Sequence, residues 1–233
     1  MALPFSGNES SDTRAATVLL LVLLVADIAF VLAHYLLTTG VLGDALFSLE
    51  LDRGYAEFFQ YAKVCSIAIM LLAITARSRV VGYGVWALLF LYLLIDDAFQ
   101  IHEDFGGYLA STLEFAPAIG LRAQDFGELA VSLIAAGVFL SFLALFYISE
   151  SGGFRKASRH LLLLLLALAF FGVFVDLLHV AVNMGWRITW LFGVIEDGGE
   201  MVAVSLMAAY VFLLNSRDGD IRSPSPARPR EIL

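Results

Sequence analysis

Residues 91–104 read LYLLIDDAFQIHED, and the rest of the sequence is best interpreted from this stretch. It begins as a run that suits a lipid bilayer and ends in polar and charged residues: Asp96, Asp97, Gln100, His102, Glu103 and Asp104. An ionised side chain near a bilayer centre costs roughly 2.5–3.5 kcal/mol. We therefore expect these groups to be neutralised by one another, by protons, by water or by a metal ion. If the stretch is one helix, Asp96, Gln100 and Glu103 share a face.

The composition predicts an all-α, polytopic membrane protein. Hydrophobic residues make up 60% of the chain and charged residues 15%, whereas soluble domains average about 45–50% and about 25%. The net charge of −8 and the lack of a basic stripe argue against a nucleic-acid partner. Cys65 is the only cysteine, which excludes an intramolecular disulfide and a thiol-rich metal site.

Six apolar segments are long enough to cross a bilayer, which takes about 20 residues each. They are residues 16–38, 56–76, 80–102, 126–148, 160–183 and 190–214. The first exceeds the 7–15 residues of a signal-peptide core, so we interpret it as a retained span. The domain organisation expected is an N-terminus at 1–15, a six-helix transmembrane domain at 16–214 and a disordered tail at 215–233, rich in Pro, Ser and Arg.

The distribution of Arg and Lys predicts the orientation. Ten of them flank one end of the spans and three the other, while Lys63 lies within the second span. The positive-inside rule then places both termini in the cytoplasm, in a plasma or inner membrane. The connections on the opposite side, 39–55 and 104–124, are apolar. They are expected to be either short amphipathic helices in the outer interface or loops that pack on the bundle.

Ionisable residues in all six spans fall at the midplane or in the outer half, whereas stretches such as LLLLLLALAFF at 161–171 carry none. This pattern predicts a polar chamber open toward the extracytoplasmic side. Its acidic and histidine members are expected to include Asp27, His34, Glu57, Asp97, His102, Asp125, Glu128, Asp176, His179, Glu196, Asp197 and Glu200. Lys63 is expected to be the counter-charge to Glu57 or Asp27, with a Schiff-base lysine as the alternative.

So many carboxylates cannot all be ionised in a low-dielectric site, so we expect some to be protonated or a cation to be bound. A mixture of Asp, Glu and His without thiolates suits Zn²⁺, Fe²⁺ or Mn²⁺. Asp176 and His179, at i and i+3, place two such ligands on one helix face. The expected divalent-metal ligands are Asp97, His102, Glu128, Asp176, His179, Glu196 and Glu200. Asp96 or Glu103 is then a candidate catalytic general base.

The leading functional hypothesis is a metal-dependent enzyme, hydrolytic or oxidative, acting on a lipid or other apolar substrate. This site chemistry resembles that of membrane-embedded hydrolases of the alkaline-ceramidase and adiponectin-receptor type, but their seven spans and closely spaced late histidines have no counterpart here. The alternatives are a cation or proton transporter or channel, and a non-catalytic ion-binding subunit of a larger complex or oligomer. A transporter predicts polar residues that continue to the cytoplasmic side.

Overall fold

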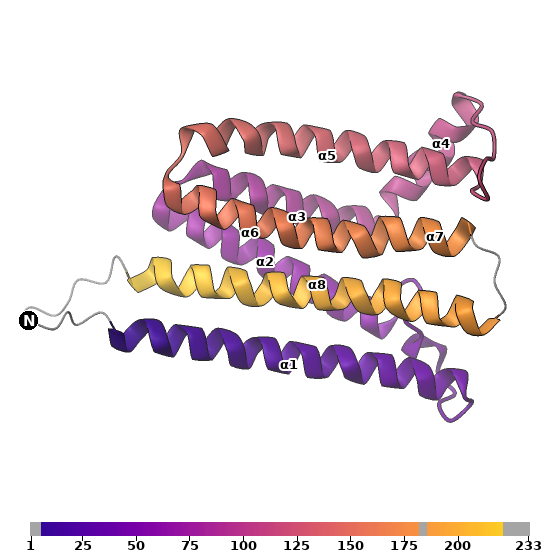
Figure 1. Cartoon of the computed structure of the whole chain (residues 1–233), viewed down its shortest axis with the longest axis horizontal. Helices are drawn as coiled ribbons and strands as arrows, with labels where there is room; N and C mark the ends of the chain where they lie inside the picture. The colour runs from indigo at the N-terminus through magenta and orange to yellow at the C-terminus, as the bar shows by residue number, and fades with distance from the viewer. Residues whose placement is uncertain (1–5, 182–185, 221–233) are drawn as a thin grey trace, which may run out of the picture.

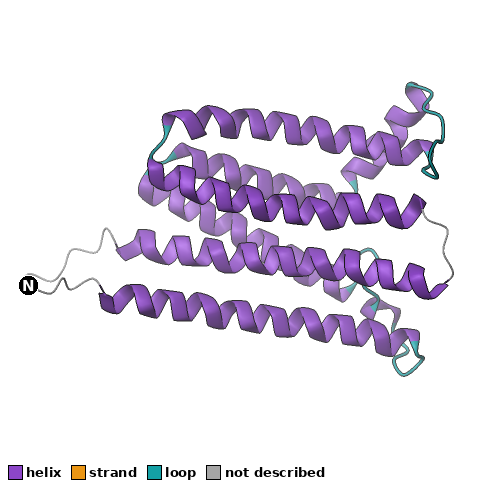
Figure 2. Ribbon diagram, viewed as in Figure 1, coloured by secondary structure: helices purple, strands orange, loops and turns teal. Residues whose placement is uncertain are grey.

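The computed structural model describes residues 6–181 and 186–220, and it confirms an all-α bundle with six helices long and apolar enough to span a membrane (Figures 1 and 2). No strand occurs in these two ranges. In chain order the elements are α1 Ser6–Thr38, η1 Ala45–Phe47, α2 Tyr55–Ser78, α3 Val81–Phe99, α4 Ile101–Thr112, α5 Ala123–Ser149, α6 Gly152–Ala169, η2 Phe170–Val175, α7 Asp176–Ala181 and α8 Trp186–Asp220.

Each predicted span falls within a helix or a helix series, but several ends differ. The fifth begins eight residues early, at Gly152, because the Ser151 side chain caps it by accepting a hydrogen bond from Phe154 N (3.4 Å). It runs through a π-helical segment, η2, into α7. The first six residues of the predicted disordered tail are helical, since α8 continues to Asp220. The remaining tail, 221–233, residues 1–5 of the N-terminus and residues 182–183 of the fifth span lie outside the described residues.

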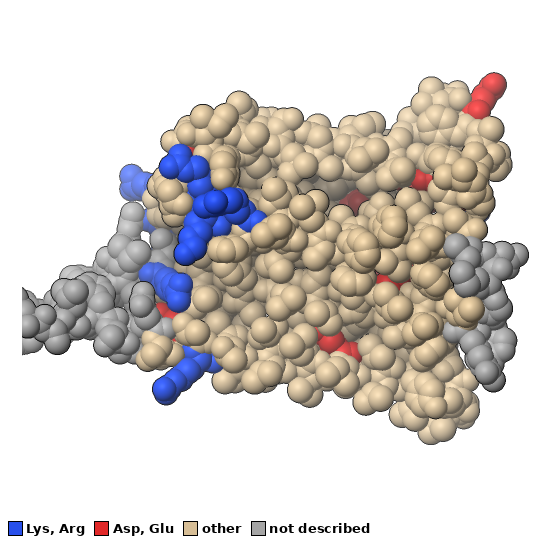
Figure 3. All heavy atoms as spheres, in the orientation of Figure 1, with Lys and Arg blue, Asp and Glu red and all other residues tan. Residues whose placement is uncertain are grey.

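The bundle has an apolar core and an apolar outer surface, as a membrane protein requires. The core lies between α2, α3, α6 and α8, where Ile67, Phe90 and Met207 are fully buried. Large apolar side chains on the outward faces are exposed, among them Val25 and Leu163. Figure 3 shows Lys and Arg gathered at the end of the bundle where α1 begins. We call this the basic end; Arg79, in the connection between α2 and α3, belongs to it.

A buried ion pair ties α1 to α2 and α8. Lys63 Nζ lies 2.9 Å from Asp27 Oδ1 and also donates to Met201 O (2.9 Å) and Ser205 Oγ (3.2 Å). Ser205 Oγ in turn donates to Asp27 Oδ2 (2.6 Å). Lys63 is thus the counter-charge to Asp27 rather than to Glu57, whose carboxylate accepts hydrogen bonds from Tyr61 and from Arg53 N.

Residues 91–104 do not form one helix, so the condition under which Asp96, Gln100 and Glu103 would share a face is not met. Helix α3 ends at Phe99, and Gln100 has a left-handed backbone with φ 54°. The Gln100 side chain donates to Asp52 Oδ2 (2.9 Å), a residue of the first outer connection, which fixes the break. Helix α4 then leaves at an angle and crosses the end of α5 (Figure 1).

The two outer connections differ from each other. The second contains a helix, α4, whereas the first forms only the three-residue η1 and folds back onto the bundle. Leu49 is buried, and its backbone N donates to His34 Nδ1 (3.1 Å). His34 therefore anchors this loop and does not line the polar chamber, contrary to the expectation from its depth. The loop carries Glu50 and Asp52 toward the bundle axis.

Candidate functional site

A cavity of about 1030 Å³ lies among the helix halves farther from the basic end. Eleven carboxylates line it, and we call it the acidic cavity. They are Glu50, Asp52, Glu57, Asp97, Glu103, Asp125, Glu128, Asp176, Glu196, Asp197 and Glu200. Arg122, His102 and His179 are its basic lining residues within the described chain. Carboxylates therefore greatly outnumber basic side chains in this cavity.

Glycines allow helices to pack closely around the acidic cavity. A Cβ at Gly172 in η2 would collide with Glu200 Oε1, so the glycine leaves room for that carboxylate between η2 and α8. A Cβ at Gly127 on α5 would collide with Gly106 O on α4. Two glycines at this crossing bring α4 against α5, which places His102 and Glu128 on the same cavity. The π-helical turn at η2 is of a kind often found at functional sites.

Three ion pairs organise part of the acidic charge. Arg122 caps the start of α5 through Asp125, with Nε to Oδ1 at 2.9 Å and Nη2 to Oδ1 at 2.6 Å, and this carboxylate raises the pKa of Arg122. His179 Nδ1 lies 3.0 Å from Glu196 Oε2. His102 Nδ1 lies 3.2 Å from Asp96 Oδ2.

Two groups of α4, outside the spans, have shifted pKa values. Asp96 beside the imidazole raises the pKa of His102 above its ordinary value of 6.5 by stabilising the protonated form, although burial opposes this. Burial raises the pKa of Glu103, because the ionised carboxylate loses contact with water. Both shifts favour the protonated forms.

A second cavity, of about 360 Å³, extends from the acidic cavity toward the basic end. We call it the apolar cavity. Its walls come from α3, α5 and α6, with Phe90, Phe139 and Leu165 among the lining side chains. It reaches the lipid-facing surface at Leu140 and Leu166, which line it and are 41% and 57% exposed. The apolar cavity therefore borders the lipid-facing surface between α5 and α6.

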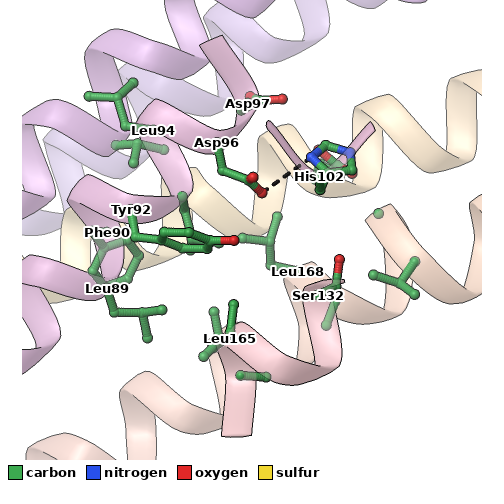
Figure 4. Close-up of a pocket in the computed structure, with 18 of the residues that line it drawn as sticks. Leu89, Phe90, Tyr92, Leu94, Asp96, Asp97, His102, Ser132, Leu165 and Leu168 are labelled. Carbon is green, nitrogen blue, oxygen red and sulfur yellow. Dashed lines mark ion pairs between the residues drawn. The ribbon is translucent and has the colours of Figure 1, made fainter. Parts of the chain in front are cut away.

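The two cavities adjoin each other. Eight residues line both: Gln60, Asp97, His102, Asp125, Glu128, Gly172, Asp176 and Glu200. Figure 4 shows this junction, with the Asp96–His102 pair at one end of a space bordered by Leu89, Leu165 and Leu168. The Tyr92 and Ser132 hydroxyls point into the same space. One end of the combined site is thus apolar and the other acidic.

The structure brings most of the predicted site residues together. Nine line the acidic cavity: Glu57, Asp97, His102, Glu103, Glu128, Asp176, His179, Glu196 and Glu200. Asp96 lines the apolar cavity beside His102. Lys63 and Asp27 line neither cavity; they form the separate buried pair. Asp97 and His102 line both cavities, as the cost of exposing them to lipid predicts, although the Asp97 side chain is itself exposed.

The converging metal-ligand set expected from Asp176, His179, Glu196 and Glu200 does not form in the described ranges. No group of three or more His, Cys, Asp or Glu side chains there is close enough to hold an ion. The reason is geometric: the carboxylates surround a wide cavity, and His179 pairs with Glu196 alone. Metal binding itself stays a prediction that rests on donor chemistry.

Sequence reasoning missed several residues of the site. Glu50 and Asp52 lie in a loop that had no assigned contact with the chamber, and only its fold onto the bundle places them there. Tyr92 and Ser132 lie in the apolar stretches of α3 and α5. Their sequence signal is weak, because isolated hydroxyls in a span often bond to their own helix, as Ser141 does to Gly137 O (2.6 Å).

Residues 13–214 match the family model described as Domain of unknown function (DUF8692), and the chain belongs to this family. No curated protein and no solved structure matches the chain. The family match includes four of the six membrane-length helices whole and all but the outermost three residues of the first and the last.

Proposed function

We propose that this protein is a membrane-embedded enzyme acting on a lipid-like amphiphile. The apolar chain of the substrate lies in the apolar cavity after entering between α5 and α6, and its polar head reaches the acidic cavity. The reacting bond lies at the junction, beside His102. The observation that carries this proposal is that an apolar cavity and an acidic cavity lie side by side and share eight lining residues.

The Asp96–His102 pair supplies acid–base chemistry at the junction. With Asp96 Oδ2 3.2 Å from Nδ1, Nε2 is left to take a proton from water or a hydroxyl and to return it to a leaving group. Asp96, predicted as a base in its own right, then acts through His102. Glu103 lies on the same short helix, but it lines the acidic cavity and not the apolar one.

A divalent cation is a second candidate occupant of the acidic cavity. Carboxylates and imidazoles are ligands that Zn²⁺, Fe²⁺ and Mn²⁺ accept, and a bound ion would activate water and neutralise charge. Elemental analysis of purified protein tests this. A stoichiometric metal that is lost in a His179→Ala variant and kept in a His160→Ala variant supports it; His160 bonds instead with Tyr210 OH (3.0 Å).

Transport of a cation or proton is less well supported. The core of α2, α3 and α8 toward the basic end is closed by fully buried apolar side chains such as Ile67 and Phe90. The cavity that extends in this direction is itself lined by leucines and phenylalanines. A polar path across the membrane would need these elements to separate.

The basic end, with Arg77 and Arg155 among its residues, supports the expected orientation with both termini in the cytoplasm. The acidic cavity would then open on the extracytoplasmic side of a plasma or inner membrane. Cysteine labelling in a Cys65→Ser background tests this arrangement. A cysteine at Ser111 should react with an impermeant reagent added outside, and one at Ser151 only after permeabilisation.

The enzymatic proposal is tested by incubating the purified chain in lipid nanodiscs with single-chain esters and amides and measuring products by mass spectrometry. Replacing His102 with alanine should reduce turnover about 10²–10⁴-fold, whereas His160→Ala should leave it unchanged. Blocking the apolar cavity with Leu168→Trp should also abolish turnover. Leu163→Trp, on the lipid-facing side of the same helix, is the matched control. Equal effects of the two tryptophans would contradict the proposed chain site.

A further inference from the structure

The side-chain oxygen of Gln60 lies at the junction of the two cavities without a donor among the described residues. Gln60 lies on α2 and is 8% exposed, and it lines both cavities. Its Oε1 atom has no hydrogen-bond donor within the described residues. A buried amide oxygen left without a donor costs roughly 1–3 kcal/mol. The site therefore offers a buried acceptor that an N–H or O–H group of a bound molecule can satisfy.

The charge around Gln60 points to the nature of that donor. Eleven carboxylates line the acidic cavity, against a single arginine, which Asp125 already pairs. The nearest lysine on the same helix, Lys63, is three residues away and is fully occupied by Asp27, Met201 O and Ser205. An anionic head group would be repelled here, whereas a cationic one that carries N–H groups satisfies both the charge and the orphan acceptor.

We propose that the head of the ligand is a protonated primary amine on a single long chain. The ammonium lies on the acidic-cavity side of the junction, donating to Gln60 Oε1 and attracted by carboxylates such as Glu128 and Glu200, which line both cavities. The chain follows the apolar cavity toward Leu165 and Phe139. This inference rests on the proposed amphiphile site and adds the class of its head group.

The volume of the apolar cavity also fits a single chain. The apolar cavity holds about 360 Å³, toward the lower end of the range of roughly 300–1,000 Å³ that small-molecule sites occupy. Two acyl chains with a bulky head would need more space between α5 and α6. The amphiphile expected is therefore slender, with the charge at one end.

The test is equilibrium binding to the full chain in neutral-lipid nanodiscs. Three probes share one hexadecyl chain and differ in the head: a primary amine, an alcohol and a phosphate. The amine should bind at least about tenfold more tightly than the alcohol, because a charge-assisted hydrogen bond is stronger than a neutral one, and the phosphate should bind most weakly. Gln60→Leu and Glu200→Gln should each reduce the amine preference about tenfold. Glu114→Gln, outside both cavities, is the control for loss of a carboxylate.

The outcomes separate the two proposals. If the three probes bind equally, and Leu168→Trp weakens all of them, the amphiphile site stands and the amine inference fails. If none binds, or Leu168→Trp has no effect, the proposed function fails with it. If EDTA is needed before the amine binds, a metal ion occupies the acidic cavity. The metal ion, and not an amine, then neutralises the carboxylates in the native protein. Thermal stability and nanodisc incorporation of each variant establish that the fold is intact.

Discussion

Replacing Lys63 with methionine tests whether the buried pair with Asp27 stabilises the bundle. Both side chains are 3% exposed, so the variant leaves a carboxylate among α1, α2 and α8 with only the Ser205 hydroxyl as donor. Methionine keeps the length of the aliphatic stem and removes the three contacts of Nζ. Removing one partner of a buried ion pair costs about 3–5 kcal/mol, whereas replacing both by apolar residues is often nearly neutral.

The double variant Asp27→Leu/Lys63→Met should therefore be more stable than Lys63→Met alone. We expect a coupling energy of about 2–3 kcal/mol in the double-mutant cycle. Unfolding in mixed micelles by added dodecyl sulfate, followed by the fluorescence of the three tryptophans, measures each free energy. Lys156→Met, at an exposed position of α6, is the matched control and should change stability by less than about 0.5 kcal/mol. A Lys63→Met variant as stable as this control would refute the reasoning.

The remaining predictions concern the cavities. The pKa of His102 is raised by Asp96, and only the neutral imidazole acts as a base, so turnover should rise with pH through a midpoint above 6.5; Asp96→Asn should move this midpoint down. Gly172→Leu should displace Glu200 and weaken binding of the hexadecyl amine, whereas Gly137→Leu, which has open space around it, should not. We expect water activated by His102 to be the nucleophile, so Ser132→Ala should change turnover by less than about tenfold; complete loss would indicate a covalent serine intermediate.

The six-helix membrane architecture could be predicted from the sequence because the apolar segments are long and clearly separated. Apolar runs of spanning length predict helices in a membrane with few alternatives, and the depth of charged residues such as Glu128 and Asp176 depends only on helix rise. Both side chains do line one cavity. These predictions rest on local properties of the chain.

The interior geometry could not be predicted in the same way, because it depends on contacts between distant segments. The helix break at Gln100 is fixed by Asp52, which lies 48 residues away in sequence. That break turns His102 back toward Asp96. On a continuous helix the two side chains would lie on different faces and could not pair. The same applies to the role of His34, which depends on the path of the loop at Leu49.

Photo-crosslinking locates the bound amphiphile and tests the central claim most directly. A hexadecyl amine with a diazirine at the chain terminus is irradiated with the purified protein in nanodiscs, and labelled residues are mapped by mass spectrometry. The account predicts labels on apolar-cavity residues of α3, α5 and α6, such as Phe90, Phe139 and Leu165, and their loss in Leu168→Trp. Labels confined to exposed faces such as Val25 on α1, and unchanged in that variant, would contradict it.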